Sequence, residues 1–434
     1  MSSHNLQILH KDQEITYSKN TYDQYQTRIA EVCHDASKQA LATLVRLFGD
    51  LDLAESTLQD AIQIAKKHWL QQGIPGNPQE WLISTAYLNA MHNLRFVDNT
   101  SGINHIAVRR QNPATHLMEI SRSELRNDQL CLIFLCCHPA FNVETQLVLT
   151  LHIVGRLPIN AIASALSIPQ KVIAQRIMRA KIKVREHRIE YEIPTSAYFL
   201  ERLNAILHII HLIFNAGYQI SFDRSQDQRD LFRDAIQLCR WLLGLLPEES
   251  EIQGLLALML LHNARQTVQS SIENDLVLLF EHDRSYWKRN LIVESRILIG
   301  QALNSSCFGS YTLQAAIAAV HAEAPDAEKT DWCRIVGLYD LLMRVNPVPI
   351  VEFNRVIALA MVHGPETGLT MTASLLQRGL LHDYHLMYAA RADFFYRLGQ
   401  VNMAIKTYEQ ALELAQLEPE RQFIEYRMAE LPQI

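Results

Sequence analysis

Residues 170–188 concentrate positive charge in a chain that is acidic overall. The segment carries seven Lys and Arg residues and a single carboxylate, Glu186, whereas the whole chain of 434 residues has a formal net charge of -6. Arginine and lysine can bind guanine edges in the major groove of DNA, glutamine can bind adenine, and cations neutralise phosphates. The composition of this segment is therefore typical of a helix that reads DNA.

The spacing of apolar residues in the same segment predicts a helix with one packing face. Ile173, Ile177, Ala180 and Val184 follow steps of four, three and four residues, which places them on one side of a helix at about 100° per residue. The other side and its flank carry the candidate DNA-binding residues, which are Gln170, Lys171, Gln175, Arg176, Arg179 and Lys183.

A short helix and a tight turn precede this cationic helix. The sequence INAIASAL (159–166) leads into Ser167, Ile168 and Pro169, and the arrangement predicts a helix-turn-helix motif. The alternative is a solvated cationic face on an ordinary helix. The turn and its spacing favour DNA binding over that alternative.

Other residues that carry chemistry do not form a recognisable catalytic or metal-binding pattern. Cys131, Cys136, Cys137 and His138 are close in sequence, but they lie in an apolar segment and do not form two separated ligand pairs, so we expect buried thiols and no metal. The sequence contains no H-E-x-x-H, G-x-S-x-G, P-loop or G-x-G-x-x-G motif. We therefore expect no catalytic residues, no cofactor and no enzymatic activity.

Composition and length bound the class of protein. The chain is long enough for two to four domains, and its seven cysteines include no C-x-x-C pair, which favours a reducing compartment. The N-terminal segment lacks the cationic start and apolar core of a secretory signal, and no apolar run approaches the roughly 20 residues that span a bilayer. We expect a cytoplasmic protein with no membrane association.

Apolar spacings of three and four residues predict an all-α fold for almost every segment. Polar and proline-containing stretches divide the chain into a helical block at 18–98, a linker at 99–119, a second block at 120–190 and a larger unit at 191–434. Residues 385–416 form two amphipathic helices hinged at Gly399 that are similar to a tetratricopeptide repeat. We expect a short helical solenoid there, with an irregular helical bundle as the alternative.

Motifs in three separate blocks resemble one family. LIFLCCHPAFNVETQLVLTLHIVGRLPINAIASALSIPQKVIAQRIMRAKIKVRE (132–186) is similar to region 4 of extracytoplasmic-function RNA polymerase sigma factors of the sigma-70 family, and CCHPAF with AQRIMRAKIK resembles a subgroup with a long C-terminal tetratricopeptide-like extension. LFGDLDLAESTLQDAI (47–62) resembles the region 2 helix that docks on the polymerase, and HLIFNAGY (211–218) resembles the extension.

This resemblance implies a fold, a function and a set of binding residues. The fold would be a sigma region 2 helical bundle, a sigma region 4 helix-turn-helix and a C-terminal solenoid, in a protein that directs core RNA polymerase to specific promoters. The partners implied are the β′ coiled coil and β flap of the polymerase and promoter DNA, with room for the extension to contact the sigma blocks of the same chain. The polymerase-binding residues would be Asp50, Asp52, Glu55, Gln59 and Asp60.

The segment that would contact the -10 promoter element departs from the family pattern. Its candidate residues are Trp81, Asn89, His92, Asn93 and Arg95, and only the last is a permanent cation where the family is usually rich in arginine. Fewer cations mean fewer phosphate contacts. Two interpretations follow, a divergent sigma factor with a relaxed -10 contact, or a degenerate sigma-like paralogue that acts as a protein-interaction scaffold without promoter melting. The retained cations at 170–188 favour the first.

Overall fold

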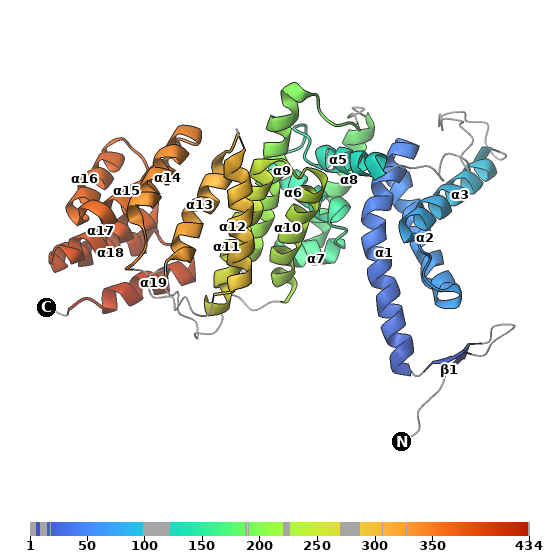
Figure 1. The fold of residues 1–434 in the computed structure, drawn as a ribbon, viewed down its shortest axis with the longest axis horizontal. Coiled ribbons are helices and arrows are strands. Elements are labelled where there is room, and N and C mark those ends of the chain that lie inside the picture. The colour runs from blue at the N-terminus through green and yellow to red at the C-terminus, as the bar shows by residue number, and fades with distance from the viewer. Residues whose placement is uncertain are drawn as a thin grey trace, which may run out of the picture. The chain divides into compact units, whose positions relative to one another are not determined.

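The structure is a computed structural model that describes residues 6–8, 15–17, 19–98, 122–186, 189, 191–219, 226–269, 287–305, 307–326 and 328–432. The described residues are almost entirely helical (Figure 1), which confirms the all-α prediction. A two-stranded antiparallel hairpin, β1 (Leu6–Ile8) and β2 (Ile15–Tyr17), precedes the first helix, with Leu6 opposite Tyr17. The sequence analysis did not predict this hairpin. The expected linker at 99–119 lies outside the described residues.

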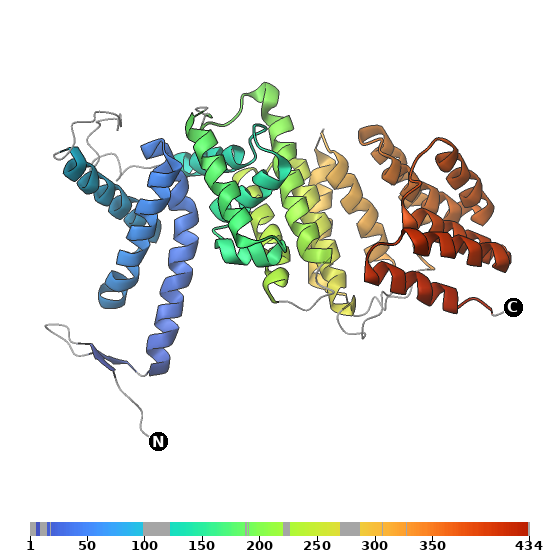
Figure 2. The same cartoon turned by 180° about the vertical axis from the view of Figure 1, so that it is seen from behind.

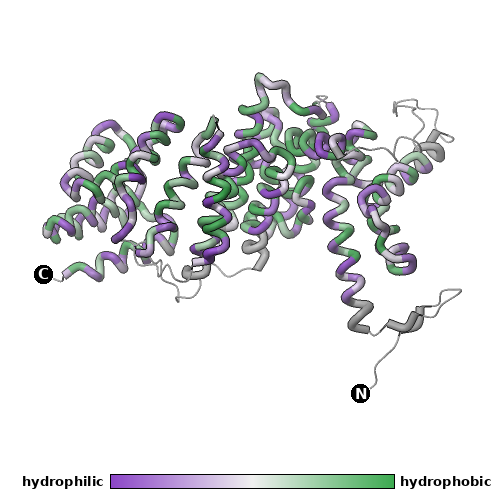
Figure 3. Tube along the Cα trace, viewed as in Figure 1, coloured by the Kyte–Doolittle hydropathy of each residue, from purple (hydrophilic) through white to green (hydrophobic). Residues whose placement is uncertain are grey.

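Three helices form the first block of the chain, and they are α1 (Lys19–Phe48), α2 (Leu51–Gln72) and α3 (Pro78–Asp98). Each packs on the other two. Gly49, with φ +66°, makes the turn between α1 and α2 in a left-handed conformation that favours glycine. Asp50 then caps α2, because its Oδ1 accepts hydrogen bonds from two backbone N–H groups of the first turn, at 2.8 and 3.0 Å. In Figure 3, hydrophobic and hydrophilic segments alternate along α1, as expected for a helix with one buried side.

The second block continues with short helices, which are α5 (Arg122–Cys136), α6 (Val143–Leu149), the π-helical turn η2 (Thr150–Val154), α7 (Ile159–Ala165) and α8 (Gln170–Glu186). Helix α5 packs on α1. At this contact Arg46 Nε of α1 donates a hydrogen bond to Asp128 Oδ1 of α5 at 2.6 Å. The hydroxyl of Tyr191 lies 2.8 Å from the carbonyl oxygens of both Ala42 and Asp128, one on each helix, and can donate to either. Polar contacts therefore tie the first block to the second.

The chain divides into two compact units, and the division falls within α10 (Gln226–Leu245). The first unit contains α1 to α9 and the part of α10 up to Ala235. Helix α9 (Ser196–Gln219) lies in this first unit, although the sequence analysis assigned its residues to the block that begins at 191. The reason is its packing on α5, where Arg202 donates a hydrogen bond to the carbonyl oxygen of Phe134 at 2.7 Å and Phe199 lies 5.7 Å from the ring of Phe134.

Helix α9 also contains an apolar stretch, Ser196–Gly217, that is long enough to cross a membrane. No other described helix meets the same criteria of length and composition. No stretch of this kind was expected from the sequence. The apolar side chains in its middle, among them Leu207, Ile210 and Phe214, are buried within the first unit. The burial covers only part of the stretch, since 39% of its most apolar window is buried.

The second unit is a succession of helices, which are α11 (Ser250–Gln269), α12 (Arg289–Asn304), α13 (Ser310–Glu323), α14 (Trp332–Val345), α15 (Pro349–His363), α16 (Pro365–Gln377), α17 (His385–Arg397), α18 (Val401–Leu414) and α19 (Glu418–Ala429). From α13 onward each helix packs on the next (Figures 1 and 2). Helices α11 and α13 approach closely at Gly254, where a Cβ atom would lie 2.5 Å from the backbone nitrogen of Thr312. The carboxylate of Glu251 accepts hydrogen bonds from three backbone N–H groups at the start of α13.

The pair of helices predicted at 385–416 is present as α17 and α18. Gly399 makes the turn between them with φ +74°. Ala404, Tyr408 and Ala411 of α18 are buried against α17 and α19. This arrangement of stacked helix pairs agrees with the expected solenoid in the second unit.

Candidate nucleic-acid interface

The two helices and the turn of the expected DNA-reading motif are present. Helix α7 ends at a tight turn in which Ile168 N donates a hydrogen bond to Ala163 O at 3.0 Å and Ser167 adopts a left-handed φ of +53°. Helix α8 follows directly, with Pro169 O accepting hydrogen bonds from the first amides of the helix. Three of the four residues of the predicted packing face, Ile173, Ile177 and Ala180, are buried, whereas Val184 near the end of the helix is only partly buried. The packing face of α8 therefore lies against the body of the first unit.

Four of the six predicted DNA-binding side chains are exposed, and they are Gln170, Lys171, Gln175 and Arg179. The same face also exposes two apolar side chains, Val172 and Met178, with 36% and 54% of their surfaces accessible. Neither was among the predicted DNA-binding residues, although both lie off the packing stripe and among the cationic residues. Apolar side chains on such a face can contact the methyl group of thymine.

The other two predicted DNA-binding residues contact the protein itself. Arg176 forms an ion pair with Glu144 of α6 at 2.6 Å and retains 28% of its side-chain exposure. Lys183 Nζ donates a hydrogen bond to the carbonyl oxygen of Ala140 at 2.6 Å and lies over the ring of Phe141. Both contacts arise because this flank of α8 lies beside α6 and the turn that precedes it. The helical periodicity identified the flank, but it contained no information about which element lies next to it.

The opposite flank of α8 contacts the predicted polymerase-binding residues of α2. Lys181 Nζ lies 2.8 Å from Asp52 Oδ1 and also forms a close ion pair with Glu55. Arg156 and His152 approach Glu55 Oε1 as well, at 3.5 and 3.7 Å. Only 14% of the Glu55 side chain is exposed. We call these five residues the ion cluster.

A π-helical turn positions the two members of the ion cluster that precede α7. Gly155 N donates a hydrogen bond to Thr150 O at 2.9 Å, which gives the i→i+5 pattern, and Arg156 follows with φ +58°. A Cβ atom on Gly155 would lie 2.7 Å from Leu151 O, so this turn favours glycine. One nitrogen of the His152 ring hydrogen-bonds to Leu157 O at 3.0 Å, while the other faces Glu55.

Charge and burial shift the pKa values of the cations in this cluster. Burial alone would lower the pKa of Lys181, but the hydrogen bonds that it donates to Asp52 and Glu55 and the charges of both carboxylates outweigh burial and raise the pKa. Burial lowers the pKa of Arg156, and the charge of Glu55 opposes that effect. Both side chains are cations at neutral pH, so the cluster holds opposite charges in a partly desolvated position.

The remaining polymerase-binding candidates lie in different environments. Asp50 is the N-cap of α2, with its carboxylate engaged by the backbone of the first turn. Gln59 and Asp60 are exposed further along α2. The five candidates thus comprise one helix cap, two members of the ion cluster and two exposed side chains.

The candidate -10 residues lie on α3, and Trp81 has a clear packing role. Its ring is 5.4 Å from that of Trp69, edge-on, and 5.5 Å from that of His68. Asn89 is half-buried and His92 is exposed. Asn93 and Arg95 belong to the same helix, but their side chains lie outside the described residues.

The sequence cluster of cysteines around His138 forms part of the core. Cys136 and Cys137 are buried, and burial raises the pKa of both thiols, to about 12 for Cys137. Cys137 Sγ lies 3.4 Å from Thr150 Oγ1. Within the part of the chain that the structure describes, no three His, Cys, Asp or Glu side chains gather as a metal site would require.

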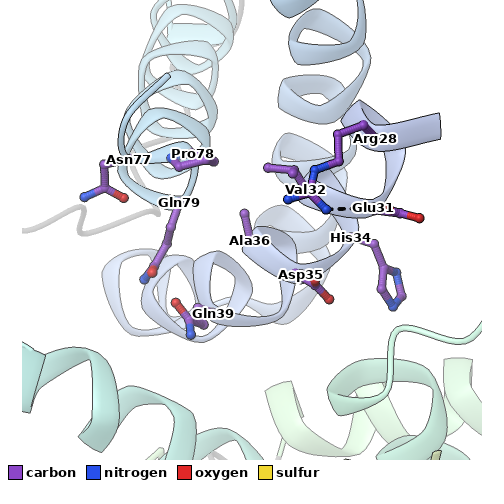
Figure 4. A pocket seen from close by; sticks show the side chains of 10 residues that line it. All are labelled: Arg28, Glu31, Val32, His34, Asp35, Ala36, Gln39, Asn77, Pro78 and Gln79. Carbon is purple, nitrogen blue, oxygen red and sulfur yellow. Dashed lines mark hydrogen bonds and ion pairs between the residues drawn. The ribbon is translucent and has the colours of Figure 1, made fainter. Parts of the chain in front are cut away.

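An open pocket lies between α1 and the start of α3 (Figure 4). Its lining is mostly polar and includes an exposed ion pair between Arg28 and Glu31 at 3.4 Å. Asn77 at the start of α3 donates a hydrogen bond to Glu80, at 2.9 Å. The pocket contains none of the residues predicted to bind DNA or polymerase.

Two similarities place the chain among known sequences. Residues 202–303 match a family of unknown function, DUF6596. An uncharacterized protein of Rhizobium meliloti (strain 1021) is 36% identical over 413 residues, which represent 91% of this chain and 94% of that protein. An alignment of that extent includes residues of both structural units.

Proposed function

This chain and the uncharacterized Rhizobium meliloti protein belong to one family, and for this chain we propose the function of a sigma factor that directs core RNA polymerase to specific promoters. The observation that carries the proposal is the exposed face of α8, where Lys171, Gln175 and Arg179 project from a helix that packs through Ile173 and Ile177. A helix held in this way after a tight turn can enter the major groove of DNA.

The chemistry of the exposed face agrees with direct reading of bases. Two cations provide phosphate or guanine contacts, glutamine suits adenine, and the exposed Val172 and Met178 suit thymine methyl groups. This combination of cations, glutamine and apolar side chains on one helix face supports the proposal.

The rest of the chain is assigned roles that follow from the resemblance. Helix α2 would bind the polymerase, with Gln59 and Asp60 exposed for that contact. The second unit would be a regulatory or interaction module, and the protein would work in the cytoplasm. No step of RNA synthesis belongs to this chain, since polymerisation is carried out by the polymerase.

A transcription assay with purified core RNA polymerase tests the proposal. We expect the full chain to bind core polymerase and to direct initiation from a subset of promoter fragments in a genomic library, which core polymerase alone does not transcribe. Absence of core binding together with absence of initiation would refute the sigma-factor function.

A specific feature of α3 supports a second candidate, a sigma-like scaffold without promoter melting. The ring of the partly buried Trp81 contacts the rings of His68 and Trp69 within the protein, which leaves less of it available to stack on an unpaired base. In this case the chain would bind core polymerase and duplex DNA, but permanganate footprinting would detect no unpaired thymines at any promoter. Reactive thymines near position -10 would exclude the scaffold.

A further inference from the structure

The ion cluster joins the face of α2 that is expected to bind polymerase to the flank of the DNA-reading helix α8. We propose that this cluster is an autoinhibitory latch, in which Lys181 and Arg156 occupy Asp52 and Glu55 and must be displaced before polymerase docks. This inference rests on the proposed function, because it concerns the regulation of the same polymerase-binding site.

The geometry of the cluster makes Glu55 inaccessible to a partner. Its side chain is 14% exposed, and Lys181, Arg156 and His152 surround its two carboxylate oxygens. Asp52 is more open, at 53% exposure, but its Oδ1 is engaged by Lys181 at 2.8 Å. A polymerase segment therefore cannot reach Glu55 while Lys181 and Arg156 are in place, and it must compete with Lys181 for Asp52.

The charges in the cluster balance when they are paired inside the chain. Lys181 and Arg156 provide two positive charges against the two carboxylates of Asp52 and Glu55, and one ring nitrogen of His152 also faces Glu55. Partly buried charges of this kind are stable only with a partner, since an uncompensated charge there is costly. A partner that displaces Lys181 from Asp52 and Glu55 must therefore supply its own cations. The chemistry of the site selects a basic segment of the polymerase.

The latch leaves the DNA-reading face of α8 exposed. Lys181 lies on the flank of the helix. Lys171, Gln175 and Arg179 project from the face opposite the packing residues, and they remain exposed. The closed arrangement thus blocks polymerase docking without covering the side chains expected to contact DNA. The consequence is a chain whose access to polymerase is limited by its own helix-turn-helix block.

Further contacts hold the two blocks in the position that closes the latch. Arg46 and Asp128 pair between α1 and α5, and Tyr191 reaches carbonyl oxygens on both helices. These contacts use none of the five residues of the ion cluster and do not involve the carboxylates of α2. Removing the cluster therefore releases the polymerase-binding face without removing every contact between the blocks.

The decisive experiment measures the affinity of the full chain for purified core RNA polymerase. The variant Lys181→Met removes the cation, and Arg156 remains to compensate Glu55. If the latched state, with Lys181 paired to Asp52 and Glu55, cannot bind polymerase, a variant that populates this state less binds polymerase more tightly. We therefore expect a dissociation constant about five- to tenfold lower than that of the wild type. Arg156→Met removes the latch from a different element and should act in the same direction.

Two control variants separate the latch from a general effect of charge. Arg185→Met removes an exposed cation one turn along the same flank of α8, and it should leave the dissociation constant unchanged. Lys181→Arg keeps the charge and should bind like the wild type. Circular dichroism melting of each variant establishes that the compared proteins are folded.

The outcomes distinguish the latch from the function on which it rests. Equal or weaker polymerase binding by folded Lys181→Met and Arg156→Met, with a wild type that binds, would overturn the latch and leave the sigma-factor proposal intact. If neither the wild type nor these variants bind core polymerase, both proposals fail. Binding by the variants alone supports both, because it shows that the closed chain withholds a functional site.

Discussion

The difference between Arg179 and Arg176 provides a sharp test of the DNA-reading helix. Both are cations on α8, but Arg179 is exposed while Arg176 already pairs with Glu144 at 2.6 Å. Arg179→Ala removes a side chain that is free to contact DNA. Arg176→Ala removes one whose contact with DNA would first require loss of an ion pair.

The expected magnitudes follow from these environments. A lost arginine contact to a base costs about 1–3 kcal/mol, so Arg179→Ala should weaken binding roughly 5- to 150-fold. Each lost phosphate contact lowers the slope of log K against log salt by about 0.9. Breaking the surface ion pair of Arg176 costs up to about 1 kcal/mol, which offsets part of any contact with DNA. We expect Arg176→Ala to weaken binding by less than about threefold.

Fluorescence anisotropy measures both quantities. The probes are a fluorescein-labelled duplex of about 30 base pairs with random sequence and, where one has been selected from a promoter library, a specific duplex, each titrated between 50 and 200 mM KCl. Arg289→Ala, an exposed arginine of α12 in the second unit, serves as the matched control and should bind like the wild type. An Arg176→Ala defect equal to or larger than that of Arg179→Ala would refute the assignment of the exposed face, as would unchanged binding by Arg179→Ala.

Three further predictions concern stability and reactivity. Gly254→Ala should lower the melting temperature and cost about 1–3 kcal/mol in urea unfolding, because its Cβ would collide with Thr312; an unchanged melting temperature would contradict the close approach of α11 and α13. Burial, with a smaller contribution from a neighbouring histidine, lowers the pKa of His211 from 6.5 to about 4. As the pH falls, the unfolded chain therefore takes up this proton before the folded chain does, and the free energy of unfolding decreases from pH 6.5 to 4. His211→Gln should flatten that part of the pH profile of stability. Of the seven cysteines, only Cys307 and Cys333 are exposed, so Ellman's reagent should titrate about two thiols in the folded chain and seven after unfolding; more than two rapid reactions would contradict the burial of the others.

Local periodicity was sufficient for the helices and for the packing face of α8. Ile173, Ile177 and Ala180 are buried as their spacing predicted, and Gly399 makes the expected turn between α17 and α18. These features depend on residues three to four positions apart or on one backbone conformation, both of which are visible in the sequence. The hairpin before α1 was missed because its two three-residue strands are too short for a clear alternation.

The sequence by itself determined which residues of α8 face the core, and it proposed which carry charge toward DNA. Only the tertiary structure decided what the flanks of that helix meet, Glu144 for Arg176 and the carboxylates of α2 for Lys181. It also placed α9 in the first unit through its contact with α5. The physical reason is that helical periodicity fixes direction around one axis, whereas an ion pair between residues 52 and 181 depends on how separate helices pack. The proposed latch could therefore not be predicted from the sequence, because the pairing of its residues depends on tertiary packing.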